Sequence, residues 1–194
     1  MNLFFLHVDP QTCAQQHCDK HVVKMLLETA QILYTAHHLS KSILPKGAYK
    51  LSYPGHPTVV WASKCYENYK YASLVGIYLS KEYTHRYGKI HSCDKHIKWL
   101  YENIPSFSNE INYKNKVVLS YNDDFQSAGM TPVPLAMPED VKSYDTIHSY
   151  RSYYIIYKKH FTKWTSREVP YWFTFYSIRS FFKKQSVLPS PDSD

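Results

Sequence analysis

A mainly α fold is the expectation from this sequence, and three observations lead to it. Apolar side chains recur three or four residues apart over several long segments, which is the period of an amphipathic helix. Proline and glycine stand where such helices begin and end, as Pro10 and Gly88 do. The chain has 194 residues, which suits one substantial domain. We predict a compact single-domain helical fold over residues 1–185 and a disordered C-terminal tail at 186–194.

The first part of the chain is expected to hold a short extended segment and then a long helix. Residues 2–8 are typical of an extended segment. Asp9 is a suitable N-cap for a helix that spans residues 10–39. Residues 40–56 contain two prolines and two glycines, which indicates a connection without regular structure.

Two more helices are expected in the middle of the chain. The longer one should span residues 57–87 and end at Gly88, because glycine readily adopts the left-handed conformation of a C-cap. The shorter one should cover residues 93–103 and end before the next proline.

The last third of the chain is expected to begin with a long irregular connection at about 105–138, which contains four prolines. Residues 116–121 could form a strand within it. An irregular stretch of this length often serves as a lid or binding loop. Further helices are predicted over residues 140–161 and 168–184, although the aromatic run at 171–176 could be extended instead.

The helix expected at residues 10–39 carries its polar side chains on one narrow stripe. At about 100° per residue, an arc of roughly 100° holds six of them, namely Lys20, Gln31, Lys24, His17, Glu28 and His21. The remaining circumference is mostly apolar, so the stripe should face either water or a cleft. Its histidines, lysine and glutamate could perform acid–base or Schiff-base chemistry. The alternative is a solvated face on which Lys24 and Glu28 form an i,i+4 ion pair.

The composition favours an acidic partner. A formal net charge of +7 and 19 tyrosines, which can stack on bases, suit a nucleic acid. No apolar run is long enough for a membrane span or a signal peptide, so we expect no membrane partner. The four cysteines are typical of reduced thiols in a cytoplasmic protein. The frequent Lys, Tyr, Asn and Ile have AT-rich codons, which weakly suggests a virus; the compartment would then be the host cytoplasm.

A short internal repeat raises the question of a metal. Cys18 and His21 recur with the same spacing as Cys93 and His96, and the four together could form a tetrahedral zinc site. Zinc fingers place their ligands on turns with other spacings, so we expect coincidence, and no metal or other cofactor. The sequence contains no Walker loop, dinucleotide-binding fingerprint, zincin motif or nucleophile elbow.

Several short motifs resemble one family. They are Met1, Asn2 and Phe4; Asp9 and Pro10; Cys18, Asp19, Lys20, His21, Val22, Val23 and Lys24; Glu28; and Glu82, Tyr83, Arg86, Tyr87, Gly88 and Lys89. Over residues 1–96 this pattern resembles the pyrimidine-dimer DNA glycosylase (endonuclease V-like) superfamily, in its short bacterial and phage branch. Later motifs around Arg151 and Trp164 resemble viral members without an assigned activity. The resemblance implies a compact helical fold that acts on DNA bases.

The family's mechanism assigns the nucleophile to the α-amine that is exposed when Met1 is removed, with a glutamate as acid–base partner. This chain departs from the pattern, because Asn2 is a poor second residue for methionine removal, and whether Met1 is removed stays open. We assign Glu28 as the acid–base group, and Lys24 as either a nucleophile, which would require its desolvation, or a phosphate contact. His21 and His17 complete the candidate catalytic set.

We therefore expect a glycosylase/lyase-like enzyme that acts on DNA and recognises a flipped modified or damaged pyrimidine. Its expected DNA contacts are Arg86, Lys89, Arg151, Lys158, Trp164 and Arg167. A phage-type transferase that hypermodifies a thymine derivative in DNA is one alternative. A non-catalytic nucleic-acid-binding module is another, and it predicts that the polar stripe is open to bulk water. We expect a monomer.

Overall fold

The computed structural model describes residues 1–107, 111–114 and 116–175 of the chain, and it confirms the mainly α prediction. The helices and strands are α1 (Pro10–Gln16), α2 (Asp19–Leu39), α3 (Pro57–Ala62), α4 (Tyr66–Tyr87), α5 (Asp94–Glu102), β1 (Leu119–Ser120), α6 (Asp123–Ser127), β2 (Val133–Pro134), η1 (Glu139–Val141), α7 (Thr146–Tyr153), η2 (Tyr154–Lys158) and η3 (Lys159–Phe161). Residues 171–175 are also helical.

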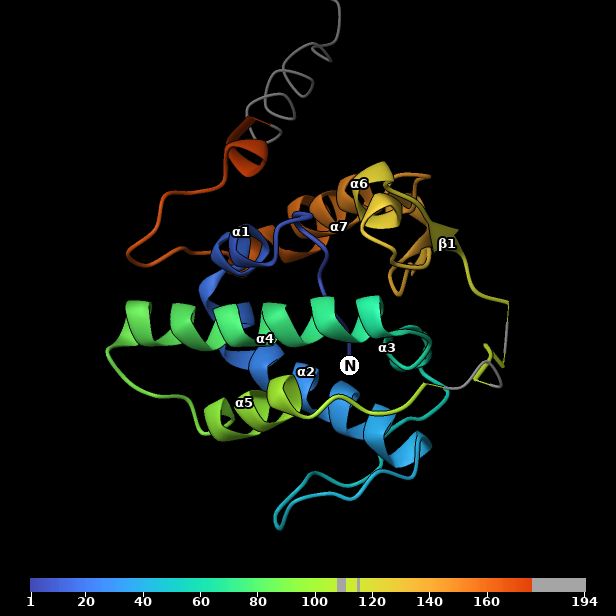
Figure 1. Ribbon diagram of the computed structural model, residues 1–194. Helices are drawn as coiled ribbons and strands as arrows, with labels where there is room; N and C mark the ends of the chain where they lie inside the picture. The colour runs from blue at the N-terminus through green and yellow to red at the C-terminus, as the bar shows by residue number, and fades with distance from the viewer. Residues whose placement is uncertain (108–110, 115, 176–194) are drawn as a thin grey trace, which may run out of the picture.

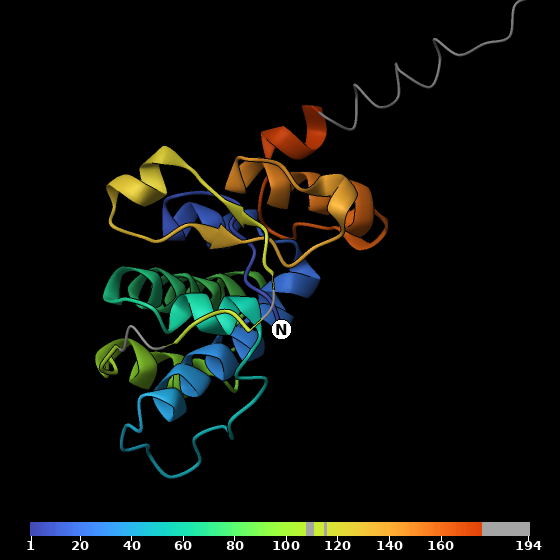
Figure 2. The same ribbon diagram turned by 90° about the vertical axis from the view of Figure 1, so that its right-hand side faces the viewer.

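The long helix α4 crosses the middle of the molecule and has a layer on each side (Figure 1). It contacts α2, α3 and α5 on one side, and α1 on the other. The layer with α1 also holds α6, α7 and the two short antiparallel strands β1 and β2, as the turned view shows (Figure 2). No helix within the described ranges is long and apolar enough to cross a membrane.

The predicted helix at residues 10–39 is two helices, because the chain becomes extended at His17 and Cys18. Asp9 does cap α1, since its carboxylate accepts the backbone N–H of Thr12 at 2.7 Å. At the break, the backbone N–H of Asp19 donates to the carbonyl oxygen of residue 163 at 2.8 Å. The partner is far along the chain, so local periodicity did not reveal the break.

The predicted helix at residues 57–87 is also interrupted. Cys65 is extended, with φ −153° and ψ 167°, and separates α3 from α4. Asn68 stabilises the turn between α3 and α4, because its side-chain amide donates to the Trp61 carbonyl and to Thr131 Oγ1, both at 2.7 Å. Gly88 ends α4 as predicted, with a left-handed φ of 62°.

The irregular connection expected at 105–138 contains more structure than predicted. It holds β1, α6 and β2, and the strand expected at residues 116–121 is reduced to Leu119–Ser120. The helix expected at 140–161 begins at Thr146, after Asp145 caps it by accepting the backbone N–H of His148 at 2.6 Å. The helix expected from residue 168 begins at 171, and its later part and the predicted tail lie outside the described residues.

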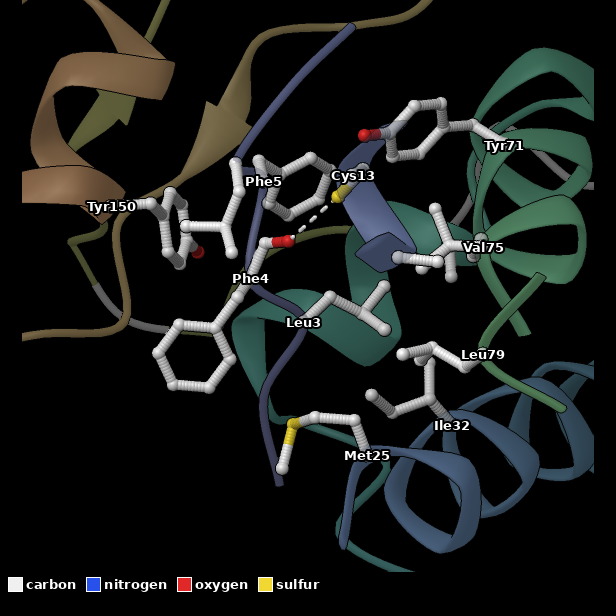
Figure 3. Close-up of a cluster of buried hydrophobic side chains, with 14 of the residues drawn as sticks. Leu3, Phe4, Phe5, Cys13, Met25, Ile32, Tyr71, Val75, Leu79 and Tyr150 are labelled. Atoms are coloured by element: carbon white, nitrogen blue, oxygen red, sulfur yellow. Dashed lines mark hydrogen bonds between the residues drawn. The ribbon is translucent and has the colours of Figure 1, made fainter. Parts of the chain in front are cut away.

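The extended N-terminal segment lies in the core. Leu3, Phe4, Phe5 and Leu6 are all buried, and each contributes roughly 1.5–3 kcal/mol by leaving water. Leu3 points toward α2 and α4, and the Phe5 ring is parallel to that of Tyr71 with centroids 5.6 Å apart (Figure 3). The Cys13 thiol donates to the Phe4 carbonyl at 3.2 Å. This burial holds the start of the chain beside α2.

Candidate functional site

A pocket of about 250 Å³ lies where the start of the chain meets α2 and the end of α7. Its lining residues are Met1, Asn2, Phe4, His21, Lys24, Met25, Glu28, Ala136, Tyr153 and Lys158. The stripe expected on the long helix thus contributes His21, Lys24 and Glu28 to one concave site. The pocket is formed by α2, the end of α7, η2 and two segments that bring in Asn2 and Ala136. The Asn2 side-chain amide donates to the Ala136 carbonyl at 3.0 Å.

The Glu28 carboxylate is surrounded by nitrogen donors. Its Oε2 accepts the backbone N–H of Asn2 at 2.7 Å and lies 4.0 Å from the α-ammonium group of Met1. Its Oε1 lies 3.3 Å from Lys24 Nζ. The Glu28 side chain is 12 % exposed, so these interactions occur largely out of water. A carboxylate in this position can accept a proton from an amine beside it and return it.

Lys24 stands at the mouth of the pocket and remains in water. Its side chain is 69 % exposed, although it forms the expected i,i+4 pair with Glu28. The desolvation that a lysine nucleophile at this position requires is therefore missing. The exposed ammonium group is suited to contact a phosphate.

His21 forms part of the pocket wall but is held in its neutral form. Its Nδ1 lies 2.5 Å from the Tyr154 hydroxyl, and its ring packs on Phe4 with centroids 4.5 Å apart. Burial lowers the pKa of His21 to about 3, and the nearby positive charges of Lys158 and Lys24 add to this effect. At neutral pH the imidazole can exchange hydrogen bonds with a ligand, but it carries no charge.

His17 lies outside this pocket. It is at the break between α1 and α2, is 1 % exposed, and its Nδ1 donates to the Cys13 carbonyl at 2.7 Å. Burial lowers the pKa of His17 to about 4. His17 was expected on the polar stripe because the prediction assumed one continuous helix over residues 10–39. The break between α1 and α2 takes His17 off that stripe.

Arg86 is buried in an ion network and cannot reach a nucleic acid. Its guanidinium donates to Glu82 Oε1 at 2.8 Å, to Asp19 Oδ1 at 2.9 Å and to the Gln15 carbonyl at 3.0 Å. Arg167 donates to both oxygens of Glu82 at 2.9 Å. Burial alone would raise the pKa of Glu82, but the hydrogen bonds from the two arginines lower it below its usual value. The expectation that Arg86 contacts DNA is therefore corrected: its side chain is buried and hydrogen-bonded within the protein. Arg167 forms hydrogen bonds to Glu82 in the same network.

The remaining expected DNA contacts fall into different surroundings. Trp164 is 8 % exposed and donates to the Gln16 carbonyl at 3.0 Å, so it is a core residue. Arg151 is half-buried and donates to the Leu6 carbonyl at 3.1 Å. Lys89 is exposed, and Lys158 lines the pocket. The lysines are the two of this set whose charge is best placed for a nucleic acid.

The two Cys–His pairs do not assemble. Cys18 is the N-cap residue of α2 and Cys93 that of α5, while His96 Nδ1 is hydrogen-bonded to the Tyr34 hydroxyl at 3.0 Å. Among the described residues, no three His, Cys, Asp or Glu side chains are grouped so that they could hold a metal ion.

Sequence reasoning missed Tyr153, which lines the pocket, and Tyr154, whose hydroxyl is hydrogen-bonded to His21. Both belong to a tyrosine-rich stretch that resembled a buried helical stripe.

Comparisons of the chain with protein-family models, with curated proteins and with solved structures found no match. The assignment of a function therefore depends on the residues and geometry of the pocket.

Proposed function

We propose that this protein is a DNA-acting enzyme of the glycosylase/lyase type, whose site is the Glu28 pocket. The observation that carries the proposal is the position of Glu28, within 2.7 Å of the Asn2 nitrogen and 4.0 Å of the Met1 amine. An amine beside a sheltered carboxylate is the pair that Schiff-base chemistry needs. If Met1 is removed, the Asn2 nitrogen becomes the amine in contact with Glu28.

The reaction can be written with these groups and water. The neutral amine forms a bond to C1′ of the deoxyribose, and the C1′–base bond breaks with its electron pair on the base, which takes up a proton from the solvent. Glu28 accepts the proton lost by the nitrogen and gives it to O4′ as the C1′–O4′ bond opens. A protonated imine then joins the nitrogen to C1′. Addition of water releases the sugar, restores the neutral amine and returns a proton to the solvent.

The pocket also suits a base that has left the duplex. Its volume of about 250 Å³ is small for a ligand site, which favours a single flipped nucleotide. Neutral His21 offers hydrogen bonds to the base or sugar, and exposed Lys24 provides a phosphate contact. The net charge of +7 favours DNA as the partner.

Borohydride trapping tests the proposal. Duplex DNA with an abasic site or a pyrimidine dimer is incubated with the full chain and borohydride, which reduces the imine to a stable amine. We expect a covalent protein–DNA adduct, and peptide mapping should locate it at the first residue of the protein. Mass spectrometry of the intact chain shows whether that residue is Met1 or Asn2.

Two variants make the result specific. Lys24→Arg keeps the positive charge but replaces the primary amine, so we expect the adduct to persist. Two residues inserted before Asn2 displace the α-amine and should abolish the adduct. Mapping of the adduct to Lys24 would assign the nucleophile to that lysine instead. DNA binding without any adduct would contradict the proposal and favour a non-catalytic module or a transferase.

A further inference from the structure

Lys158 brings an uncompensated positive charge to the Glu28 pocket. It is half-buried and lines the pocket from η2. Lys24 and the Met1 ammonium group both lie near the Glu28 carboxylate, at 3.3 and 4.0 Å. Lys158 has no ion-pair partner in the described part of the chain. The pocket therefore has more positive than negative groups and favours an anion.

Tyr153 holds the Lys158 side chain in place. The Lys158 ammonium lies 4.6 Å from the centre of the Tyr153 ring, which is cation–π geometry. The Tyr153 ring also stacks on the ring of Phe4, with centroids 5.8 Å apart and an interplanar angle of 12°. Phe4 is 6 % exposed, so the ring that orients Lys158 is anchored to the core.

The π-helical turn η2 makes this contact possible. Residues 153 and 158 are five apart, and in an α-helix, at about 100° per residue, they would lie roughly 140° from each other. In a π-helical turn hydrogen bonds join residues five apart, so such residues lie one above the other. The turn therefore brings Lys158 over Tyr153. Single π-helical turns are frequent at functional sites.

We propose that Lys158, oriented by Tyr153, binds a phosphate group at the Glu28 pocket, and that this group is a phosphodiester next to the flipped nucleotide. The inference rests on the proposed function, which supplies DNA as the substrate. Lys24 at the mouth adds a second cation for the same strand. Lys158 thereby sets which nucleotide of the backbone stands over Glu28, and Tyr153 is a positioning residue that acts through Lys158.

The contact is tested by a double-mutant cycle, in which Lys158 and one phosphate of the DNA are changed singly and together. The probe is a duplex with a tetrahydrofuran abasic-site analogue, in which each neighbouring phosphate is replaced in turn by an uncharged methylphosphonate. For the wild-type chain, one replacement should weaken binding about ten-fold, as the loss of a charge-assisted hydrogen bond does. In Lys158→Met the same replacement should have no further effect. The slope of log Kd against log salt should change by about 1.

Lys159→Met is the matched control, because it removes the same charge from the next residue, which is exposed and does not line the pocket. It should keep the wild-type response to every methylphosphonate. Equal and additive effects of the Lys158 and Lys159 substitutions at every phosphate would overturn the inference, even where trapping of the wild-type adduct upholds the proposed function.

A second arm identifies the source of the phosphate without DNA. Inorganic phosphate is titrated into the isotope-labelled chain, and amide shifts near Glu28 and Lys158 are followed by NMR. Saturable shifts that Lys158→Met removes, together with additive methylphosphonate effects, would assign the site to a free phosphate compound. If neither DNA nor inorganic phosphate responds to Lys158→Met, the phosphate site is refuted.

Two substitutions of Tyr153 show whether its ring orients Lys158 or only stabilises the fold. Tyr153→Phe keeps the aromatic face and should keep the coupling between Lys158 and the phosphate. Tyr153→Leu removes that face and should weaken binding about two- to five-fold, with loss of the coupling. An equal loss of coupling in Tyr153→Phe would show that the ring does not orient Lys158.

Discussion

Glu28 is the residue on which the chemistry of the pocket depends. Its carboxylate lies between a backbone N–H, an α-ammonium group and an exposed lysine, and each can exchange a proton or a hydrogen bond with it. Glu28→Gln keeps an oxygen that can accept the Asn2 N–H at 2.7 Å, but it removes the group that titrates. We expect turnover to fall about a hundred- to ten-thousand-fold, as when a positioned general acid or base is lost.

Stability should change far less than activity in this variant. The lost ion pair with exposed Lys24 contributes about 0.2–0.5 kcal/mol. The Met1 ammonium group lies farther away, at 4.0 Å, and the hydrogen bond to Asn2 can be retained. Turnover on modified DNA and the thermal midpoint are measured on the same sample. Wild-type turnover would remove Glu28 from the mechanism, and a large fall in the midpoint would make it a structural anchor.

At the scale of elements, the sequence predicted what depends on local periodicity. Lys24, Glu28 and His21 line one pocket, as expected from the polar stripe, because all three lie on the uninterrupted helix α2. The breaks before α2 and α4 depend on partners far along the chain, such as residue 163 for Asp19. No local pattern contains that information. For the same reason His17 was expected in the pocket.

The ion network joins three elements, and this leads to a prediction for Arg86. Its side chain is fully buried, and it links Glu82 of α4 to Asp19 of α2, which also accepts the backbone N–H of Thr165 at 2.9 Å. Arg86→Met leaves the two carboxylates without their shared partner. We expect the free energy of unfolding to fall by about 3–5 kcal/mol, the usual cost of breaking a buried pair.

Urea denaturation measures this change, and Lys89→Met provides the control. Lys89 is three residues away, is exposed, and loses the same charge, so its substitution should stay within about 0.5 kcal/mol of wild type. Equal stability of the two variants would mean that the network contributes nothing. Weaker DNA binding by a fully stable Arg86→Met would return Arg86 to the expected DNA-contact set.

At the scale of the whole molecule, three buried histidines make the fold sensitive to acid. Burial lowers the pKa of His21 to about 3, and those of His17 and His37 to about 4. In the unfolded chain a histidine has a pKa near 6.5, so between pH 6.5 and about 4 the unfolded state binds more protons than the folded state. Stability is therefore complete above pH 6.5 and declines as the pH falls through this window.

Each such histidine should cost roughly 1.4 kcal/mol per pH unit within the window. Urea denaturation at pH 7, 6 and 5 measures the decline, and His37→Phe tests its cause. His37 lies beside the Tyr69 hydroxyl at 3.0 Å and does not line the Glu28 pocket, so the substitution isolates stability from activity. Whatever its effect at pH 7, the variant should lose about 1.4 kcal/mol less stability than wild type between pH 6 and 5. An unchanged slope would show that protonation of other groups drives the acid sensitivity.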